Sequence, residues 1–180
     1  MQPRFFLLLI PVFLGSTLMA QQYNGQGTLE INFLEGSKIV HTISTDQLVA
    51  SYDADQELFR LLVKPAALSV GANAFDQSVV EEVLQSRANR LMMIQASDLV
   101  IPQNPTTKQS MGGSYSISYQ GLDVELPGVL SVTPATNGMG LELELTTSLE
   151  QLGLYLPEDF QESLSSNIQF RILNVTLTQR

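Results

Sequence analysis

Apolar and polar residues alternate along most of this chain. Residues 141–145 read Leu-Glu-Leu-Glu-Leu, and Leu29, Ile31 and Phe33 are separated in the same way by polar residues. A period of two places the apolar side chains on one face of a β-strand and the polar side chains on the other. Strands with one dry and one wet face are typical of antiparallel sheets. The pattern therefore predicts an antiparallel, all-β protein.

The same period recurs often enough for about eight or nine strands. Further alternating segments are residues 39–43, 48–53, 59–64, 114–119, 122–126 and 168–177. The turn residues between segments are Glu35-Gly36-Ser37, Gly112-Gly113, Gln120-Gly121 and Asn137-Gly138. In the last segment the apolar positions change phase between Ile172 and Leu173, as they would at a β-bulge. We expect residues 102–113 to form one long hairpin loop.

One stretch has the spacing of a helix. Within residues 75–84 the apolar positions recur every three or four residues, which predicts a short helix inserted between strands. Asp76 stands at the N-cap position, where its carboxylate would accept hydrogen bonds from first-turn amides. A second helical turn is expected to start at Pro157, because the two acidic residues that follow suit the positive end of a helix.

Strands with a single apolar face must bury that face, either in a sandwich of two sheets or in a barrel closed on itself. A barrel of about eight strands has room inside for side chains or for one small ligand. We take the inward-facing apolar and aromatic residues as candidates for lining a ligand cavity. They are Ile31, Phe33, Leu48, Tyr52, Phe59, Leu61, Met92, Ile94, Tyr115, Tyr119, Met139, Leu141 and Leu143. An ordinary filled core uses the same residue types, so both interpretations stay open at this point.

The first twenty residues have the layout of a secretory signal peptide. A short segment with Arg4 precedes an apolar stretch at residues 5–14, and small residues then lead to Ala20. The apolar stretch is shorter than the roughly 20 residues that span a bilayer. We expect cleavage after Ala20, which leaves residues 21–180 as a single exported domain, periplasmic or secreted. The chain has no cysteine, so we expect neither a lipoprotein anchor nor a disulfide.

The charge of the chain argues against several classes of partner. The formal net charge is −9, and removal of the first twenty residues takes away only Arg4 and leaves −10. Nucleic acids and anionic lipid surfaces are bound by basic faces. We therefore expect neither as a partner, and we expect any ligand to be held by shape and apolar contact.

No group of residues predicts catalysis, a cofactor or a metal site. His41 is the only histidine, and we expect it to have a structural role. The acidic run from Asp53 to Glu57 lacks the glycine and the final glutamate of a calcium loop, so we interpret it as a solvated turn. Glu142 and Glu144 lie roughly 7 Å apart by strand rise. The alternation places both on the wet face, however, where the burial that raises a carboxyl pKa for acid catalysis is missing.

The order of several segments resembles the YceI-like family of exported, lipocalin-like barrels. The matching segments are an opening hairpin at residues 29–43, the strand at residues 47–53, a central strand at residues 92–96, the Leu-Tyr-Leu-Pro at residues 154–157 and a closing strand at residues 168–177. This resemblance implies an antiparallel lipocalin-like β-barrel of about eight strands with one inserted short helix. It also implies an isoprenoid or another lipid as the ligand.

Two functional hypotheses follow. In the first, the protein is an exported, non-enzymatic carrier that holds a lipophilic chain inside the barrel, and Tyr52, Tyr115 or Tyr119 supplies a hydroxyl to its polar end. In the alternative, the protein is a structural or protein-interaction domain with a filled core and no small-molecule ligand. An interior cavity of roughly 300 Å³ or more would favour the carrier, and a solid core would favour the alternative. The sequence leaves open whether the protein forms a homodimer.

Overall fold

The computed structural model describes residues 21–71, 76–84, 91–158 and 167–179. Most of these residues lie in strands, as the alternation predicts. The strands are β1 (Gln22–Glu35), β2 (Lys38–Asp53), β3 (Leu58–Val63), β4 (Ser69–Val70), β5 (Met92–Ala96), β6 (Gln109–Tyr119), β7 (Leu122–Ala135), β8 (Gly138–Ser148) and β9 (Asn167–Gln179). The helical elements with described bounds are α1 (Gln77–Val83) and the 3-10 turns η1 (Pro65–Ala67) and η2 (Glu150–Leu152).

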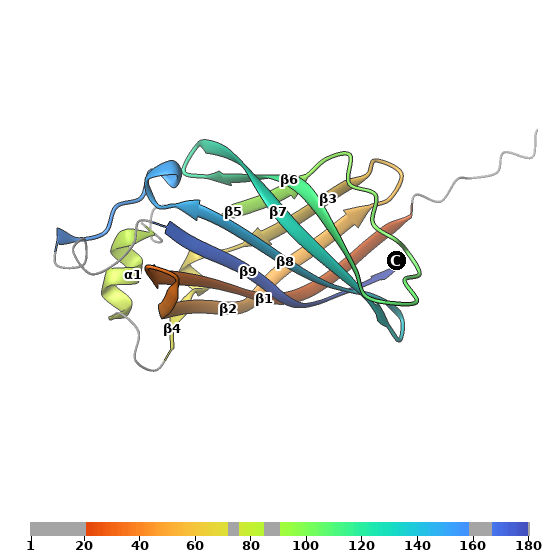
Figure 1. The fold of residues 1–180 in the computed structure, drawn as a ribbon, viewed down its shortest axis with the longest axis horizontal. Coiled ribbons are helices and arrows are strands. Elements are labelled where there is room, and N and C mark those ends of the chain that lie inside the picture. Colours follow the sequence, from red (N-terminus) through yellow and green to blue (C-terminus); the bar gives the residue numbers. More distant parts are fainter. Residues whose placement is uncertain (1–20, 72–75, 85–90, 159–166, 180) are drawn as a thin grey trace, which may run out of the picture.

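Eight of the strands form a closed antiparallel barrel (Figure 1). Their order is β1-β9-β8-β7-β6-β5-β3-β2, and the barrel closes because β1 also pairs with β2. The short strand β4 pairs with β2 beside this ring. Closure pairs the strands on both sides and leaves few open edges. The predicted fold, an antiparallel barrel of about eight strands with one short helix, is confirmed.

The strand β8 shows how the sequence period builds the barrel wall. Leu141, Leu143 and Leu145 are buried inside the barrel, whereas Glu142 and Glu144 between them are exposed on the outside. Burial of one leucine side chain contributes roughly 1.5–3 kcal/mol to folding. The dry faces of all eight strands together form the hydrophobic core, and this core is the interior of the barrel.

The β-bulge predicted near the end of the chain is present in β9. Leu141 pairs with Val175 and Leu143 pairs with Ile172, so two residues of β9 lie opposite one residue of β8. One of the two, Asn174, has a positive φ of 55°. The extra residue returns Val175 to the inner face, which explains the phase change in the sequence.

The Gly112-Gly113 pair was predicted as a turn, and this prediction is wrong. Both glycines lie inside β6, which begins at Gln109, and Gly113 pairs with Gly128 of β7. The irregular segment before β6 is therefore shorter than the predicted loop of residues 102–113. A local rule that associates glycine with turns fails here because Gly113 instead leaves room within the strand for the ring of Tyr115, described below, whereas Gly112 has no such neighbour.

Two apolar residues that the alternation placed on the inner face lie largely outside it. Ile39 is 43% exposed and Leu122 is 44% exposed. In the pairing of β1 with β2, the register shifts between Phe33 and Leu34, so Ile39 loses the inward position that Ile43 keeps. Leu122 is the first residue of β7, directly after the β6–β7 turn.

The predicted helix exists but is shorter than its sequence pattern. It spans Gln77–Val83 with Asp76 at the N-cap, and the predicted first residue, Phe75, lies outside the described residues. The expected capping bond from the Asp76 side chain is absent from the described helix start; the Asp76 backbone carbonyl instead accepts the amide of Val79 at 2.9 Å. The Gln77 side chain attaches the helix to the segment at β4, where it donates to the carbonyl of Leu68 at 3.1 Å.

Different segments lie at the two ends of the barrel (Figure 1). The helix α1 and the strand β4 lie at one end, and the β5–β6 loop and the end of β9 lie at the other. Residues 1–20 and most of the turn expected from Pro157 lie outside the described residues. Among the described residues, no helix is long and apolar enough to cross a membrane.

Candidate functional site: the barrel interior

All thirteen residues predicted to line a cavity are buried in the barrel core. Each is 0–2% exposed and belongs to one hydrophobic cluster. In this conformation their side chains fill the interior together with residues that the sequence analysis did not select, among them Leu130, Leu145 and Phe170. Their burial is as predicted, and their contact with a ligand stays a prediction.

Two of the three interior tyrosines use their hydroxyls to hold the ends of the barrel. At the last position of β6, Tyr119 donates a hydrogen bond to the carbonyl oxygen of Leu84, the C-cap residue of α1. Towards the opposite end, the hydroxyl oxygen of Tyr52 accepts the backbone N–H of Ile101 at 3.0 Å. Each hydroxyl therefore already has a partner within the protein.

The third interior tyrosine, Tyr115, is different. Its side chain is 0% exposed, and its hydroxyl oxygen is buried without a hydrogen-bond partner among the described residues. Tyr115 precedes Tyr119 by four residues on β6, a separation of roughly 13 Å along a strand. The hydroxyl group therefore lies well inside the barrel, away from the end that α1 occupies.

A pair of glycines makes room for the ring of Tyr115. Gly113 and Gly128 pair across β6 and β7. A Cβ atom on Gly128 would lie only 2.8 Å from Cδ2 of Tyr115 and would overlap the side chain of Leu145. A Cβ atom on Gly113 would lie 3.4 Å from the Tyr115 hydroxyl oxygen. The ring thus occupies the space that two side chains would otherwise fill, and the glycines fix its position.

Burial also shifts the pKa of this hydroxyl. Removal from water raises the pKa of Tyr115 to about 12. The pKa of Tyr52 is also raised by burial, although the hydrogen bond from Ile101 opposes this shift. At neutral pH the Tyr115 side chain is therefore a neutral phenol, which can donate one hydrogen bond and accept others.

The described buried residues include polar but no charged side chains: Asn32, Thr45 and Thr147. Each of these has a partner. Asn32 donates to Gln169 at 3.2 Å and accepts from the hydroxyl of Thr42 at 2.7 Å, and Thr147 donates to Gln151 at 2.9 Å. Thr45 accepts the amide of Gln47 at 3.1 Å. The barrel core can therefore neutralise no ionic ligand group with these side chains.

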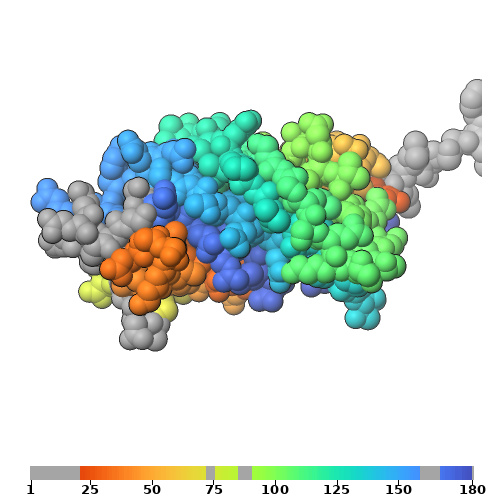
Figure 2. Space-filling model, viewed as in Figure 1, coloured from red at the N-terminus to blue at the C-terminus, as the bar shows by residue number. Residues whose placement is uncertain are grey.

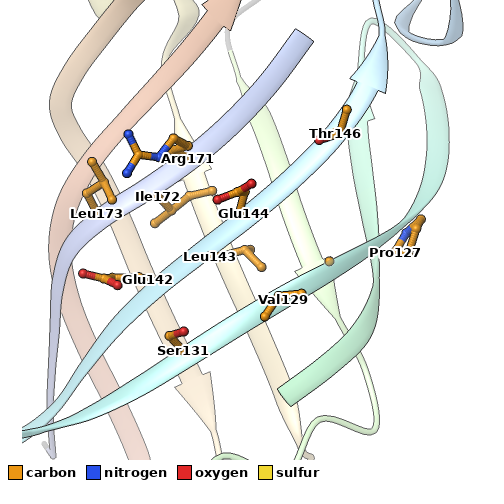
Figure 3. A pocket seen from close by; sticks show the side chains of 11 residues that line it. Pro127, Val129, Ser131, Glu142, Leu143, Glu144, Thr146, Arg171, Ile172 and Leu173 are labelled. Atoms are coloured by element: carbon orange, nitrogen blue, oxygen red, sulfur yellow. The ribbon is translucent and has the colours of Figure 1, made fainter. Parts of the chain in front are cut away.

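The outer wall carries a groove of about 610 Å³ across β7, β8 and β9 (Figure 3). Val129, Leu173, Glu142 and Glu144 are among its lining residues. On the face drawn in Figure 2, side chains of these three strands form a continuous surface over the barrel wall. The groove therefore opens on the outer side of the wall, although Leu143, one of the predicted cavity residues, is also among its lining residues.

The two glutamates that resembled a catalytic pair lie on this outer wall, as predicted. Glu142 forms an ion pair with Lys108 at 3.2 Å, and Glu144 accepts a hydrogen bond from Gln169 at 2.7 Å. Exposed ion pairs of this kind contribute little to stability. Their geometry is that of polar pairs on a solvated surface.

The acidic run at residues 53–57 forms a turn, as predicted. The carboxylate of Asp53 accepts the amides of Asp55 at 3.1 Å and Gln56 at 3.0 Å, which is the usual arrangement of an aspartate-initiated turn. Within the described part of the chain, no group of three or more histidine or acidic residues could hold a metal ion.

Sequence reasoning missed the glycines of the site. Gly113 was assigned to a turn, and Gly128 follows Pro127 and carried no signal of its own. One signal was present, because two glycines at inward positions of neighbouring strands leave space for one large side chain. Recognition of that signal requires the β6–β7 register, which pairs Gly113 with Gly128.

Comparison with solved structures supports the fold. A polyisoprenoid binding domain from Saccharophagus degradans, implicated in plant cell wall breakdown, is similar with a TM-score of 0.66 and 9% identity over 89% of this chain and 99% of that domain. BcnA from Burkholderia cenocepacia is similar with a TM-score of 0.63 and 7% identity over 83% of this chain and 96% of that one. The chain has this lipocalin-like barrel fold, as its resemblance to the YceI-like family implied. No family model and no curated protein matches the sequence.

Proposed function

We propose that this protein is an exported, non-enzymatic carrier that holds an isoprenoid or another lipophilic chain inside its barrel. The observation that carries the proposal is the apolar barrel interior with a buried hydroxyl, that of Tyr115, which has no hydrogen-bond partner among the described residues. The similar fold of a polyisoprenoid binding domain supports it. Each methylene group of a chain that leaves water for such an interior contributes about 0.8 kcal/mol.

The packing of the interior adds a condition to this function. Because the inward side chains are almost fully buried against one another, a bound chain must displace some of them. Met92 and Met139 are both completely buried, and methionine is unbranched and adapts easily to a changed cavity. Ligand entry would thus require side chains inside the barrel to move while the backbone hydrogen bonds between its strands stay intact.

Native mass spectrometry of the mature protein tests this proposal. The protein is purified from the envelope of a bacterial host, measured directly and measured again after incubation with farnesol. A bound lipid in the first spectrum, or a one-to-one farnesol complex in the second, supports the carrier. The absence of both, in a folded protein, contradicts it.

A second candidate function is favoured by the filled interior. If the core side chains do not move apart to admit a ligand, the barrel interior stays filled. The outer wall is then the surface that binds a partner. The groove of about 610 Å³ across β7, β8 and β9 is then the site to examine. This interaction domain would show no lipid in either spectrum, so the same experiment separates the two candidates.

Export rests on the layout of residues 1–20. N-terminal sequencing of the protein recovered from a periplasmic extract tests it. A mature chain that begins at Gln21 supports the assignment. A chain that retains Met1 and stays in the cytoplasmic fraction contradicts it.

A further inference from the structure

The buried hydroxyl of Tyr115 has an energetic cost. A polar group that leaves water without gaining a partner destabilises the folded state. Tyr52 and Tyr119 avoid this cost because the protein supplies their partners. A paired Gly113 and Gly128 nevertheless hold the Tyr115 ring in place. The arrangement has the form of a binding group that is oriented before its ligand arrives.

The side chains buried in the barrel restrict the ligand's chemistry. The described buried polar residues are neutral, and their side chains are already hydrogen-bonded. An anionic group that entered this interior would lose its hydration without gaining a cation from these side chains, which is costly. A neutral oxygen would lose less and would gain a hydrogen bond from Tyr115.

We infer that the barrel selects neutral lipophilic molecules bearing a hydroxyl or carbonyl oxygen, and that Tyr115 donates a hydrogen bond to that oxygen. This inference rests on the proposed lipid-binding function. It adds that a chain ending in a carboxylate or a diphosphate keeps its anionic end outside the barrel. The raised pKa of Tyr115 keeps the donor protonated across the physiological range.

Three molecules with the same farnesyl skeleton test the inference: farnesol with a hydroxyl, farnesene with no polar group and farnesyl diphosphate with an anionic group. Their Kd values are measured for the wild-type mature protein and for Tyr115→Phe. Tyr23→Phe is the matched control, because it removes the same atom from another buried core tyrosine. The ratio of the farnesol Kd to the farnesene Kd cancels effects of the substitution on chain packing.

We expect Tyr115→Phe to raise this ratio about fivefold, within the range for loss of one hydrogen bond. We expect Tyr23→Phe to leave the ratio within about twofold of wild type, below what one typical hydrogen bond accounts for. Tyr115→Phe should not change the affinity for farnesyl diphosphate. In wild-type protein labelled with ¹³C-tyrosine, farnesol should shift the Cζ signal of Tyr115 more than farnesene does, and this measurement stands even if the variant does not fold.

The outcomes separate failure of the inference from failure of the proposed function. If none of the three molecules binds the wild-type protein, the carrier function fails and the inference fails with it. If they bind but the ratio is the same in wild type and Tyr115→Phe, the inference alone is overturned. Equal changes for Tyr23→Phe, or an equal loss of farnesyl diphosphate binding, also overturn it, because the effect would then come from packing.

Discussion

The tyrosine hydroxyl in the middle of the barrel and those at its two ends differ in their hydrogen bonding. At the ends, the hydroxyls of Tyr119 and Tyr52 are bonded to the backbone of Leu84 and Ile101. In the middle, the hydroxyl of Tyr115 has no partner among the described residues. All three tyrosines are almost completely buried, so burial alone does not explain the difference.

The difference separates structural hydroxyls from a hydroxyl that is available for binding. A bond from β6 to Leu84 attaches the helix α1 to the barrel, and a bond from Ile101 to Tyr52 attaches the β5–β6 loop. Gln120 also donates to the carbonyl of Leu84, and Leu99 of the loop donates to the carbonyl of Glu57. The middle of the barrel needs no such bond, because the strands there are held by their backbone pairing. The structure therefore shows no stabilising role for a polar group in that region.

The largest expected effect tests how tightly the side chains in the middle of the barrel are packed. Leu143 lies two pairs along from the Gly128–Leu145 pair, on the inner face of β8. Leu143→Ala should destabilise the protein by roughly 2–5 kcal/mol if it fills a packed core, and by less if ligand normally occupies the space. The neighbouring Glu144→Ala on the outer face should stay within about 0.5 kcal/mol. Urea unfolding followed by circular dichroism measures both, and equal losses would contradict the assignment of inner and outer faces.

The glycine pair provides a second test of the middle. Gly128→Ala would place a Cβ atom in overlap with the Leu145 side chain and 2.8 Å from the Tyr115 ring and should cost about 1–3 kcal/mol, as overpacking does. Gly112→Ala is the control, because its Cβ atom would have no neighbour nearer than 4.0 Å. Thermal melts of the two variants should differ clearly. Equal melting temperatures would contradict the close packing of Tyr115 and Leu145 against Gly128.

A third prediction concerns the dependence of folding stability on pH. The pKa of Tyr115 in the folded protein is about 12, above the value of about 10 for an unfolded tyrosine. The neutral form is therefore favoured by folding, and this stability is complete below pH 10 and is lost as the pH rises towards 12. The loss should reach roughly 3 kcal/mol at most. Tyr115→Phe should lose less stability than wild type between pH 8 and pH 11, and parallel losses would contradict the assignment.

The smallest expected effect is the change in stability when a tyrosine loses its hydroxyl, and it has opposite signs at the ends and in the middle of the barrel. Tyr119→Phe and Tyr52→Phe each remove a hydrogen bond and should lower stability by about 1 kcal/mol. Tyr115→Phe removes an unpaired hydroxyl and should raise stability by about the same amount, which corresponds to a gain of about 2–4 °C in Tm. Calorimetry of the three ligand-free variants measures this. A lower Tm for Tyr115→Phe would show that its hydroxyl has a partner within the folded protein.

Much of the barrel could be predicted from the chain, because each strand carries its own period. The inner position of Leu143, the outer position of Glu144 and the bulge after Ile172 all follow from local order of apolar residues. The exposure of Ile39 did not follow, because it depends on the register that β2 adopts against β1. Register is a property of two strands, and the pattern of one strand does not contain it.

The candidate site could be predicted only in part, for the same reason. Alternation placed Tyr52, Tyr115 and Tyr119 on the inner face, and the structure agrees. It could not distinguish them, because their hydrogen-bond partners lie 35 residues away for Tyr119 and 49 residues away for Tyr52. Pairing of Gly113 with Gly128 likewise depends on the β6–β7 register.

Methyl signals of methionine give the most direct test of the central claim, that the barrel binds a lipophilic chain in its interior. Met92 and Met139 are completely buried in the core, whereas the neighbouring Met93 is only half-buried and belongs to the opposite face of β5. The mature protein is labelled with ¹³C-methyl methionine and titrated with farnesol. We expect the signals of Met92 and Met139 to shift in a saturable way while that of Met93 stays in place. Unchanged Met92 and Met139 signals, with or without a shift of Met93, would contradict the claim.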